Sequence, residues 1–287
     1  MPNVIANGIS IYYEFHPATN SDPTQPVSQD STPLLLIMGL GLNSLGWYKN
    51  LPGLRANRNV ITFDNRGTGR SSKPDQPYSI KQMAADTAAL LDAIGVRRAH
   101  VFGYSMGSLI AQEVALNYPQ KVKSLILGAS TPGGIHGYIP RPEVSETMLQ
   151  RGWVRNRQAA DMIIPILYSR EFMATHPEEI ARDTQMRRVY PTPPFAYRRQ
   201  LLACVQHSTY NRLDGLQMPT LVFTGSADQL VLPQNSRVLA KRISRAELVI
   251  ISGKGHYLPS EDPQITSQVV LDFLDRHFPG QSRARAA

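Results

Sequence analysis

The sequence predicts an α/β fold with one mostly parallel sheet and a helical insertion. Short apolar runs, typical of strands buried on both faces, alternate with segments of helical spacing near both ends of the chain. Between these two parts lies a block, residues 131–217, in which strand-like runs disappear and prolines separate helical stretches. One strand-to-helix turn contains Gly103-Tyr104-Ser105-Met106-Gly107. This order favours a single sheet interrupted by an insertion over two successive domains.

The elements before the insertion begin with a hairpin. Residues 3–6 and 9–15 are expected to be strands, because Asn7-Gly8 between them is a strong signal for a tight turn. Residues 17–32 are rich in Pro, Ser, Thr and Asp without periodicity, which predicts a surface loop. The remaining elements are expected as strand 34–37, a short helix or turn at 44–54, strand 59–63, helix 78–94, strand 99–102, helix 108–118 and strand 122–127.

The insertion and the elements after it complete the expected organisation. We expect a core formed by residues 1–130 and 218–287, with residues 131–217 as a cap. Helical stretches are expected at 144–151, 157–168, 177–187 and 194–206, followed by strand 220–223, helix 233–243, strand 247–251 and helix 262–277.

Composition limits the class of protein. The chain has 287 residues, a formal net charge of +8 and a single cysteine, Cys204. No apolar run approaches the ~20 residues of a membrane span, and the N-terminus lacks the apolar stretch of a signal peptide. We therefore expect a cytoplasmic protein with no membrane partner and no intrachain disulfide. Its basic residues form no run interleaved with aromatic residues, so no nucleic-acid partner is expected. The basic tail at 276–285 is expected to be frayed.

The turn at residues 103–107 predicts a serine nucleophile. In a sharp strand-to-helix turn, glycines two residues on either side of Ser105 remove side chains that would clash with adjacent backbone. The following helix offers free backbone N–H groups to developing negative charge. A solvated serine on a glycine-rich turn would have the same pattern. The prediction therefore depends on finding a base and an acid elsewhere in the chain.

His256 and Asp228 are the predicted base and acid. Functional groups in parallel α/β sheets gather beyond the carboxyl ends of the strands. Of the seven histidines, His256 alone directly follows a predicted strand downstream of Ser105. Asp228 follows the strand at 220–223, which gives the chain order Ser, Asp, His. On position alone, Asp228 could equally cap a helix or close a turn.

Two backbone N–H groups are expected to form an oxyanion hole. Met106 follows the nucleophile and would supply the first. Leu40, in the loop after strand 34–37, would supply the second, since Gly39 and Gly41 would let that backbone approach closely. These glycines could also simply form a turn, and the spacing to the next glycine disfavours a dinucleotide site. No metal or organic cofactor is expected.

With these motifs the sequence resembles the α/β-hydrolase superfamily over nearly its whole core. The resemblance implies a mostly parallel, eight-stranded sheet flanked by helices, and a triad of Ser105, Asp228 and His256. Within the superfamily the chain is similar to small esterases and lactonases, enol-lactone hydrolases and cofactor-free haloperoxidase-like esterases. The matching stretches are 34–39 with Trp47, 64–71, 103–107, 225–228, and 253–256 with 261–263.

One stretch departs from the family pattern. Met38-Gly39 stands where the family usually has His-Gly at the start of the oxyanion loop. Because the donors of the hole are backbone N–H groups, the hole can survive this change. The change places an apolar thioether near the site and raises the question of how the loop is held.

The activity implied by the resemblance is hydrolysis of carboxylic esters or lactones of small organic molecules through an acyl-enzyme. The turn at residues 103–107 is the nucleophile elbow of the family. Serine at this position argues against haloalkane dehalogenases and epoxide hydrolases, which carry aspartate there. Carbon–carbon bond hydrolysis, acyl transfer and cofactor-free perhydrolysis use the same triad and stay open. A non-enzymatic binding protein on this fold is a further alternative. The expected partner is a small-molecule ester or lactone, and no oligomeric state is predicted.

The cap is expected to determine the substrate. Its apolar side chains, among them Trp153, Ile163 and Phe172, could line an acyl or alcohol pocket or pack the cap's own helices. Its arginines could bind a substrate carboxylate or could be solvated, and the sequence singles out none of them.

Overall fold

The computed structural model describes residues 2–19, 32–154, 158 and 161–278. Most of the predicted loop at 17–32, part of the predicted helix at 157–168 and most of the predicted tail at 276–285 lie outside these residues. None of the helices in the described part has the length and apolar composition that crossing a membrane requires.

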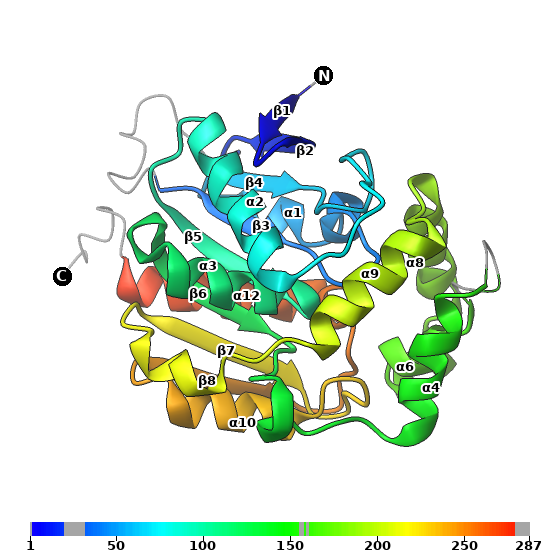
Figure 1. Cartoon of the computed structure of the whole chain (residues 1–287). Coiled ribbons are helices and arrows are strands. Elements are labelled where there is room, and N and C mark those ends of the chain that lie inside the picture. Colours follow the sequence, from blue (N-terminus) through cyan, green and yellow to red (C-terminus); the bar gives the residue numbers. More distant parts are fainter. Residues whose placement is uncertain (1, 20–31, 155–157, 159–160, 279–287) are drawn as a thin grey trace.

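The described residues form an eight-stranded sheet, as predicted. Its strands are β1 (Asn3–Ala6), β2 (Ile9–His16), β3 (Leu34–Ile37), β4 (Val60–Phe63), β5 (Ala99–Tyr104), β6 (Val122–Gly128), β7 (Thr220–Gly225) and β8 (Ala246–Ile251). Their order across the sheet is β1-β2-β4-β3-β5-β6-β7-β8. β2 pairs antiparallel with both β1 and β4, and every pair from β4 to β8 is parallel. Figure 1 shows the twisted sheet at the centre of the molecule.

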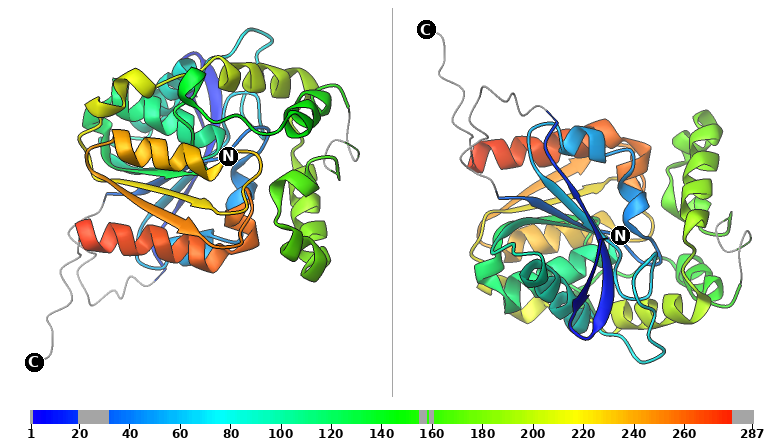
Figure 2. Two further views of the ribbon diagram at one scale, coloured as in Figure 1. Left: turned by 90° about the horizontal axis from the view of Figure 1, so that it is seen from below. Right: turned by 90° about the horizontal axis from the view of Figure 1, so that it is seen from above.

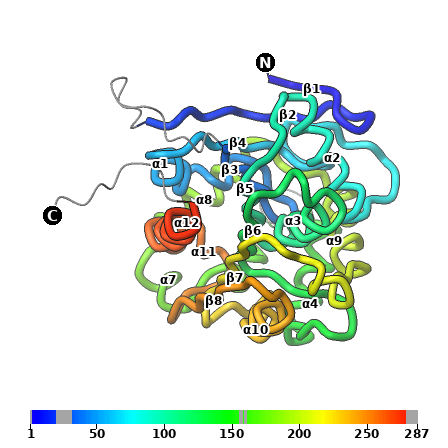
Figure 3. Tube along the Cα trace, turned by 90° about the vertical axis from the view of Figure 1, so that its left-hand side faces the viewer, coloured from blue at the N-terminus to red at the C-terminus, as the bar shows by residue number. Residues whose placement is uncertain are grey.

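Helices cover both faces of this sheet, as the two further views in Figure 2 show. They are α1 (Leu51–Leu54), α2 (Ile80–Ala93), α3 (Met106–Asn117), α10 (Pro233–Arg242), α11 (Leu258–Glu261) and α12 (Pro263–His277), with the short 3₁₀ helices η1 (Ser44–Trp47) and η2 (Pro119–Lys121). Seen along the sheet in Figure 3, α2, α3 and α10 lie on one side, and α1 and α12 lie on the other. The predicted helix or turn at 44–54 consists of two short helical segments, η1 and α1.

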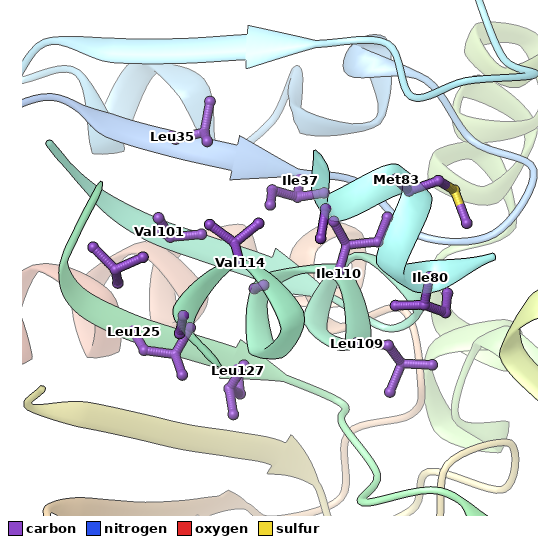
Figure 4. Packing of buried hydrophobic residues seen from close by; sticks show 14 of the residues in the cluster. Leu35, Ile37, Ile80, Met83, Val101, Leu109, Ile110, Val114, Leu125 and Leu127 are labelled. Atoms are coloured by element: carbon purple, nitrogen blue, oxygen red, sulfur yellow. The ribbon is translucent and has the colours of Figure 1, made fainter. Parts of the chain in front are cut away.

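β3 shows why the sheet is buried on both faces. Leu35 and Ile37 belong to the apolar cluster shared with α2 and α3, whereas Leu34 and Leu36 belong to the cluster shared with α12. All four side chains are 0% exposed. Successive strand side chains point to opposite faces, so a strand covered on both sides needs a continuous apolar run. Figure 4 shows Leu35 and Ile37 with Val114 of α3 in the first cluster.

Residues 131–217, called the cap segment below, connect β6 to β7. The described part of this segment contains helices, turns and one isolated bridge between Gly133 and Ser208. Its helices are η3 (Gly134–His136), α4 (Pro142–Arg151), α6 (Ile164–Leu167), α7 (Arg170–Thr175), α8 (Pro177–Val189), α9 (Pro194–Val205) and η4 (Tyr210–Gly215). In Figure 1, α4, α6, α8 and α9 lie beyond the end of the sheet toward which the parallel strands point. The segment therefore stands next to the edge where functional groups gather in parallel sheets.

Candidate functional site

Ser105 stands on the turn between β5 and α3. Its φ of 54° and ψ of −123° form a backbone conformation that L residues rarely adopt. The Ser105 N–H donates to the carbonyl of Gly128 at 2.9 Å, which fixes the turn to the end of β6. A Cβ at Gly103 would clash with the carbonyl of Gly107, and a Cβ at Gly107 would clash with the carbonyl of Ile37. The turn therefore requires glycine at both positions, as the elbow pattern predicts.

Ser105, His256 and Asp228 form a hydrogen-bonded chain. His256 Nε2 lies 3.1 Å from Ser105 Oγ, and His256 Nδ1 lies 2.8 Å from Asp228 Oδ2. Asp228 Oδ1 accepts the N–H groups of Leu230 at 2.9 Å and Val231 at 2.8 Å. His256 and Asp228 are each 3% exposed. This geometry suits a neutral imidazole that accepts at Nε2 and donates from Nδ1 to the carboxylate.

The loops that carry Asp228 and His256 are attached to each other. They follow the neighbouring parallel strands β7 and β8. The Ala227 N–H donates to the carbonyl of Lys254 at 2.9 Å, and the Gly253 N–H donates to Ser226 Oγ at 2.8 Å. These bonds fix the two loops, and with them the Asp228 carboxylate and the His256 ring, relative to one another.

Tyr104 and Glu261 hold the backbone around His256. The Tyr104 hydroxyl donates to the carbonyl of His256 at 2.6 Å. Burial raises the pKa of Tyr104 well above its ordinary value, so the hydroxyl stays a donor. The Glu261 carboxylate accepts the N–H of Gly255 at 3.0 Å and the N–H of Ser169 at 3.1 Å. No role was predicted for Tyr104 or Glu261, because Tyr104 bonds a residue 152 positions away and Glu261 connects the His256 loop to Ser169, 92 positions away.

The loop after β3 lies against the nucleophile. A Cβ at Gly39 would lie 3.1 Å from Ser105 Cβ and 3.6 Å from Ser105 Oγ. Met106 is the first residue of α3, so the helix itself does not use its N–H. In the described part of the chain, the N–H groups of Leu40 and Met106 have no hydrogen-bond partner. Both groups are therefore available to an oxygen atom bound beside Ser105.

Polar contacts hold this loop in the absence of the usual histidine. Met38 is buried, and its carbonyl accepts a hydrogen bond from Asn65 Nδ2 at 3.0 Å. Gly41 has a φ of 68°, a conformation that favours glycine. Its N–H donates to Gln200 Oε1 at 2.9 Å, and its carbonyl accepts from the Thr192 hydroxyl at 3.0 Å. Two of these partners come from the cap segment, which explains why the loop motif alone did not reveal them.

A cavity of about 600 Å³ opens at Ser105 and His256. Its size is typical of a site for a small organic ligand. Most of its lining is apolar and comes from the oxyanion loop, α3 and the cap segment. Ile163 lines this cavity, whereas Phe172 packs inside the cap segment and Trp153 is 74% exposed. The predicted apolar residues of the cap are thus divided between pocket, packing and surface.

Comparison with known proteins identifies the family. Residues 32–263 match the family described as alpha/beta hydrolase fold. A protein of Stutzerimonas stutzeri (strain A1501) named "Putative carbamate hydrolase RutD" is 28% identical over 92% of this chain and 96% of its own length. The poly(3-hydroxyalkanoate) depolymerase of Ectopseudomonas oleovorans is 31% identical over 91% of this chain and 89% of its own length. The solved enol-lactonase from Burkholderia xenovorans LB400 is 23% identical, with a TM-score of 0.81 over 95% of this chain and 99% of that chain. The protein therefore belongs to the α/β-hydrolase family and is a hydrolase.

Proposed function

We propose that the protein is a serine hydrolase that cleaves carboxylic esters or lactones of small organic molecules. The observation that carries this proposal is the hydrogen-bonded chain from Ser105 through His256 to Asp228, placed at a cavity of about 600 Å³. The names of the relatives denote a depolymerase, a carbamate hydrolase and an enol-lactonase. These names support hydrolytic chemistry at this site but do not agree on one substrate.

Acylation is the first half of the proposed reaction. Ser105 Oγ attacks the substrate carbonyl carbon while His256 Nε2 takes the hydroxyl proton. The resulting oxyanion is bound by the N–H groups of Leu40 and Met106. The imidazolium is stabilised by the Asp228 carboxylate and gives its proton to the leaving alcohol as the carbon–oxygen bond breaks.

Deacylation repeats these steps with water. His256 Nε2 takes a proton from a water molecule, whose oxygen attacks the acyl-enzyme carbonyl. The same two N–H groups bind the second oxyanion. The proton then returns to Ser105 Oγ as the acid product leaves. Each step uses groups of this chain and water alone.

The proposed cap consists of residues 131–217. Its helices α4, α6, α8 and α9 stand beyond the carboxyl ends of the strands, and Ile163, Leu167 and Tyr197 from it line the cavity. The cap would therefore exclude water and select the substrate, while the core supplies the reacting groups.

A substrate panel tests the proposal. Nitrophenyl esters of graded acyl length, simple lactones, an aryl carbamate, a vinylogous diketone and a peracid assay represent the alternative reactions of the same triad. We expect turnover of esters or lactones, and a loss of at least about 1,000-fold in Ser105→Ala with the fold intact by circular dichroism. Turnover confined to the diketone or to perhydrolysis, or full activity in Ser105→Ala, would contradict it.

A further inference from the structure

Arg151 brings a positive charge into the cavity that contains Ser105. It is the last residue of α4, and its side chain lines this cavity. The guanidinium Cζ lies 3.9 Å from the centre of the Tyr197 ring, so the group is stacked on an aromatic face. Nη1 and Nη2 lie 3.1 and 3.3 Å from the position that a Cβ at Gly41 would occupy. The missing side chain of Gly41 thus leaves room for the guanidinium directly beside the oxyanion loop.

Within the described residues, Arg151 has no carboxylate partner. Its Nε is buried without a hydrogen bond. Arginines on the outer surface of the cap segment are different: Arg182 pairs with Glu179, and Arg188 pairs with Asp161. Among the described residues, the cap segment therefore provides carboxylates for these two outward-facing arginines but none for Arg151.

The surroundings of Arg151 favour an anion. Burial lowers the pKa of Arg151; its interaction with Tyr197 raises it, and the charge of Arg187 lowers it further. Arg187, in α8, has its Cζ 4.8 Å from the Tyr257 ring centre, and its buried Nε and Nη1 also lack hydrogen-bond partners among the described residues. A desolvated cation without a counter-charge is unfavourable, and a bound anion would remove that cost.

We infer that Arg151 binds a carboxylate of the substrate, which makes the substrate an ester or lactone that carries a free carboxylate group. The inference rests on the proposed hydrolase function. The planar guanidinium can bind a carboxylate through two parallel hydrogen bonds, which a neutral ester group cannot replace. A Cβ at Gly39 would lie 3.1 Å from Ser105 Cβ, and a Cβ at Gly41 would lie 3.1 Å from Arg151 Nη1. Two residues span at most about 7 Å. One small molecule in this cavity can therefore reach both groups.

Matched substrate pairs test the inference. One pair is the mono-nitrophenyl ester of adipic acid and its methyl-capped, uncharged counterpart, which places the charge on the acyl part. The second pair is the butanoate ester of 4-hydroxybutanoic acid and the butanoate ester of 4-hydroxybutanamide. In this pair the charge is on the alcohol part. The measured quantity is the ratio of kcat/KM for the charged over the neutral member. This ratio is independent of the fraction of active enzyme.

Wild-type enzyme is expected to favour the charged member of at least one pair by about 10- to 100-fold, as a charge-assisted hydrogen bond at a buried site would give. Arg151→Met should reduce that ratio about tenfold or more. Arg151→Lys should keep part of the ratio, because lysine keeps the positive charge but cannot form two parallel hydrogen bonds with a carboxylate. Arg182→Met, which removes an exposed arginine of the cap segment, is the matched control and should keep the wild-type ratio.

A wild-type ratio near one in both pairs would overturn the inference, and so would an unchanged ratio in Arg151→Met. The latter result would make Arg151 a packing partner of Tyr197 only. These outcomes leave the proposed function standing, since the neutral esters are still hydrolysed. Failure to hydrolyse any ester or lactone, charged or neutral, would instead contradict the proposed function itself.

Discussion

At the residue scale, the orientation of His256 depends on Asp228. Asp228 Oδ2 accepts from the imidazole, while Oδ1 accepts two backbone N–H groups of its own loop. The carboxylate is therefore fixed before the imidazole becomes charged. In the proposed reaction it selects the tautomer that can accept the proton of Ser105 and stabilises the imidazolium.

Asp228→Asn separates the hydrogen bonds that fix the Asp228 loop from the action of the carboxylate on His256. The amide oxygen can still accept the N–H groups of Leu230 and Val231, so the melting temperature should change by only a few degrees. The amide carries no negative charge, and its NH₂ group can force the wrong tautomer on His256. We expect kcat on a nitrophenyl ester to fall by about 1,000- to 10,000-fold. A loss smaller than tenfold in a well-folded variant would exclude the proposed role of Asp228.

The sequence could identify Ser105, Asp228 and His256 as candidates because each follows a strand of the parallel sheet. The alternation of apolar runs and turns around each residue is enough to show that it lies at a strand end. Tyr104, Glu261 and Arg151 could not be given roles in this way. Tyr104 and Glu261 act on backbone atoms brought near by the fold, and Arg151 differs from other cap arginines only in what surrounds it.

At the element scale, Asp183 attaches α8 to the core. Its side chain is 2% exposed and accepts hydrogen bonds from the Tyr48 hydroxyl at 2.7 Å, the Tyr168 hydroxyl at 2.8 Å and Lys49 Nζ at 3.3 Å. The Ser260 hydroxyl also donates to it. Tyr48 and Lys49 follow η1, Tyr168 belongs to the cap segment and Ser260 lies in α11, so one carboxylate connects several elements.

Replacing Asp183 should loosen this connection. Asp183→Ala removes the shared acceptor of three hydroxyl groups, while Lys49 keeps Glu179 and Ser260 as partners. We expect the free energy of unfolding to fall by about 2–4 kcal/mol. KM should rise more than kcat falls, because the cap helices line the cavity while the triad lies in the core. Denaturant unfolding and ester kinetics measure the two effects. Glu178→Ala, at an exposed position of the same helix, is the control and should change the stability by less than about 0.5 kcal/mol.

Element boundaries show where periodicity is informative. The long helices α2 and α3 and the apolar strands match the predicted segments closely, because several turns or a continuous buried run give a clear signal. α7 and α11 were not predicted, because such short helices contain too few residues for a period to appear. α12 begins at Pro263, and Asp262 accepts the Ile265 N–H as its N-cap, so the predicted start at 262 is the cap residue.

At the scale of the whole molecule, His207 makes stability depend on pH. It lies near the end of the cap segment, is 7% exposed, and stands beside Glu113 of α3. Burial lowers the pKa of His207 from 6.5 to about 4, although the Glu113 charge opposes this shift. Between these two values the unfolded chain binds more protons than the folded chain. The stabilising contribution is therefore fully present above pH 6.5 and is lost as the pH falls to about 4.

Removing His207 should flatten this dependence. Over the window from pH 6.5 to 4 the contribution amounts to at most about 3 kcal/mol. As the pH falls from 6.5 to 4, the free energy of unfolding of His207→Asn should decrease less than that of the wild type. The difference between the two decreases should be at most about 3 kcal/mol. Urea unfolding at a series of pH values measures it. His176→Asn, at an exposed position, should follow the wild-type curve, and parallel curves for wild type and His207→Asn would contradict the expected shift.

The central claim is that Ser105 is the nucleophile of a triad assembled by the folded chain. Covalent labelling with a fluorophosphonate, followed by peptide mass spectrometry, tests it most directly. The expected result is stoichiometric modification of Ser105 in native protein, and none at this site in Asp228→Asn over the same time or in urea-unfolded protein. Native protein that leaves Ser105 unmodified, or that is modified at a different serine, would contradict the claim.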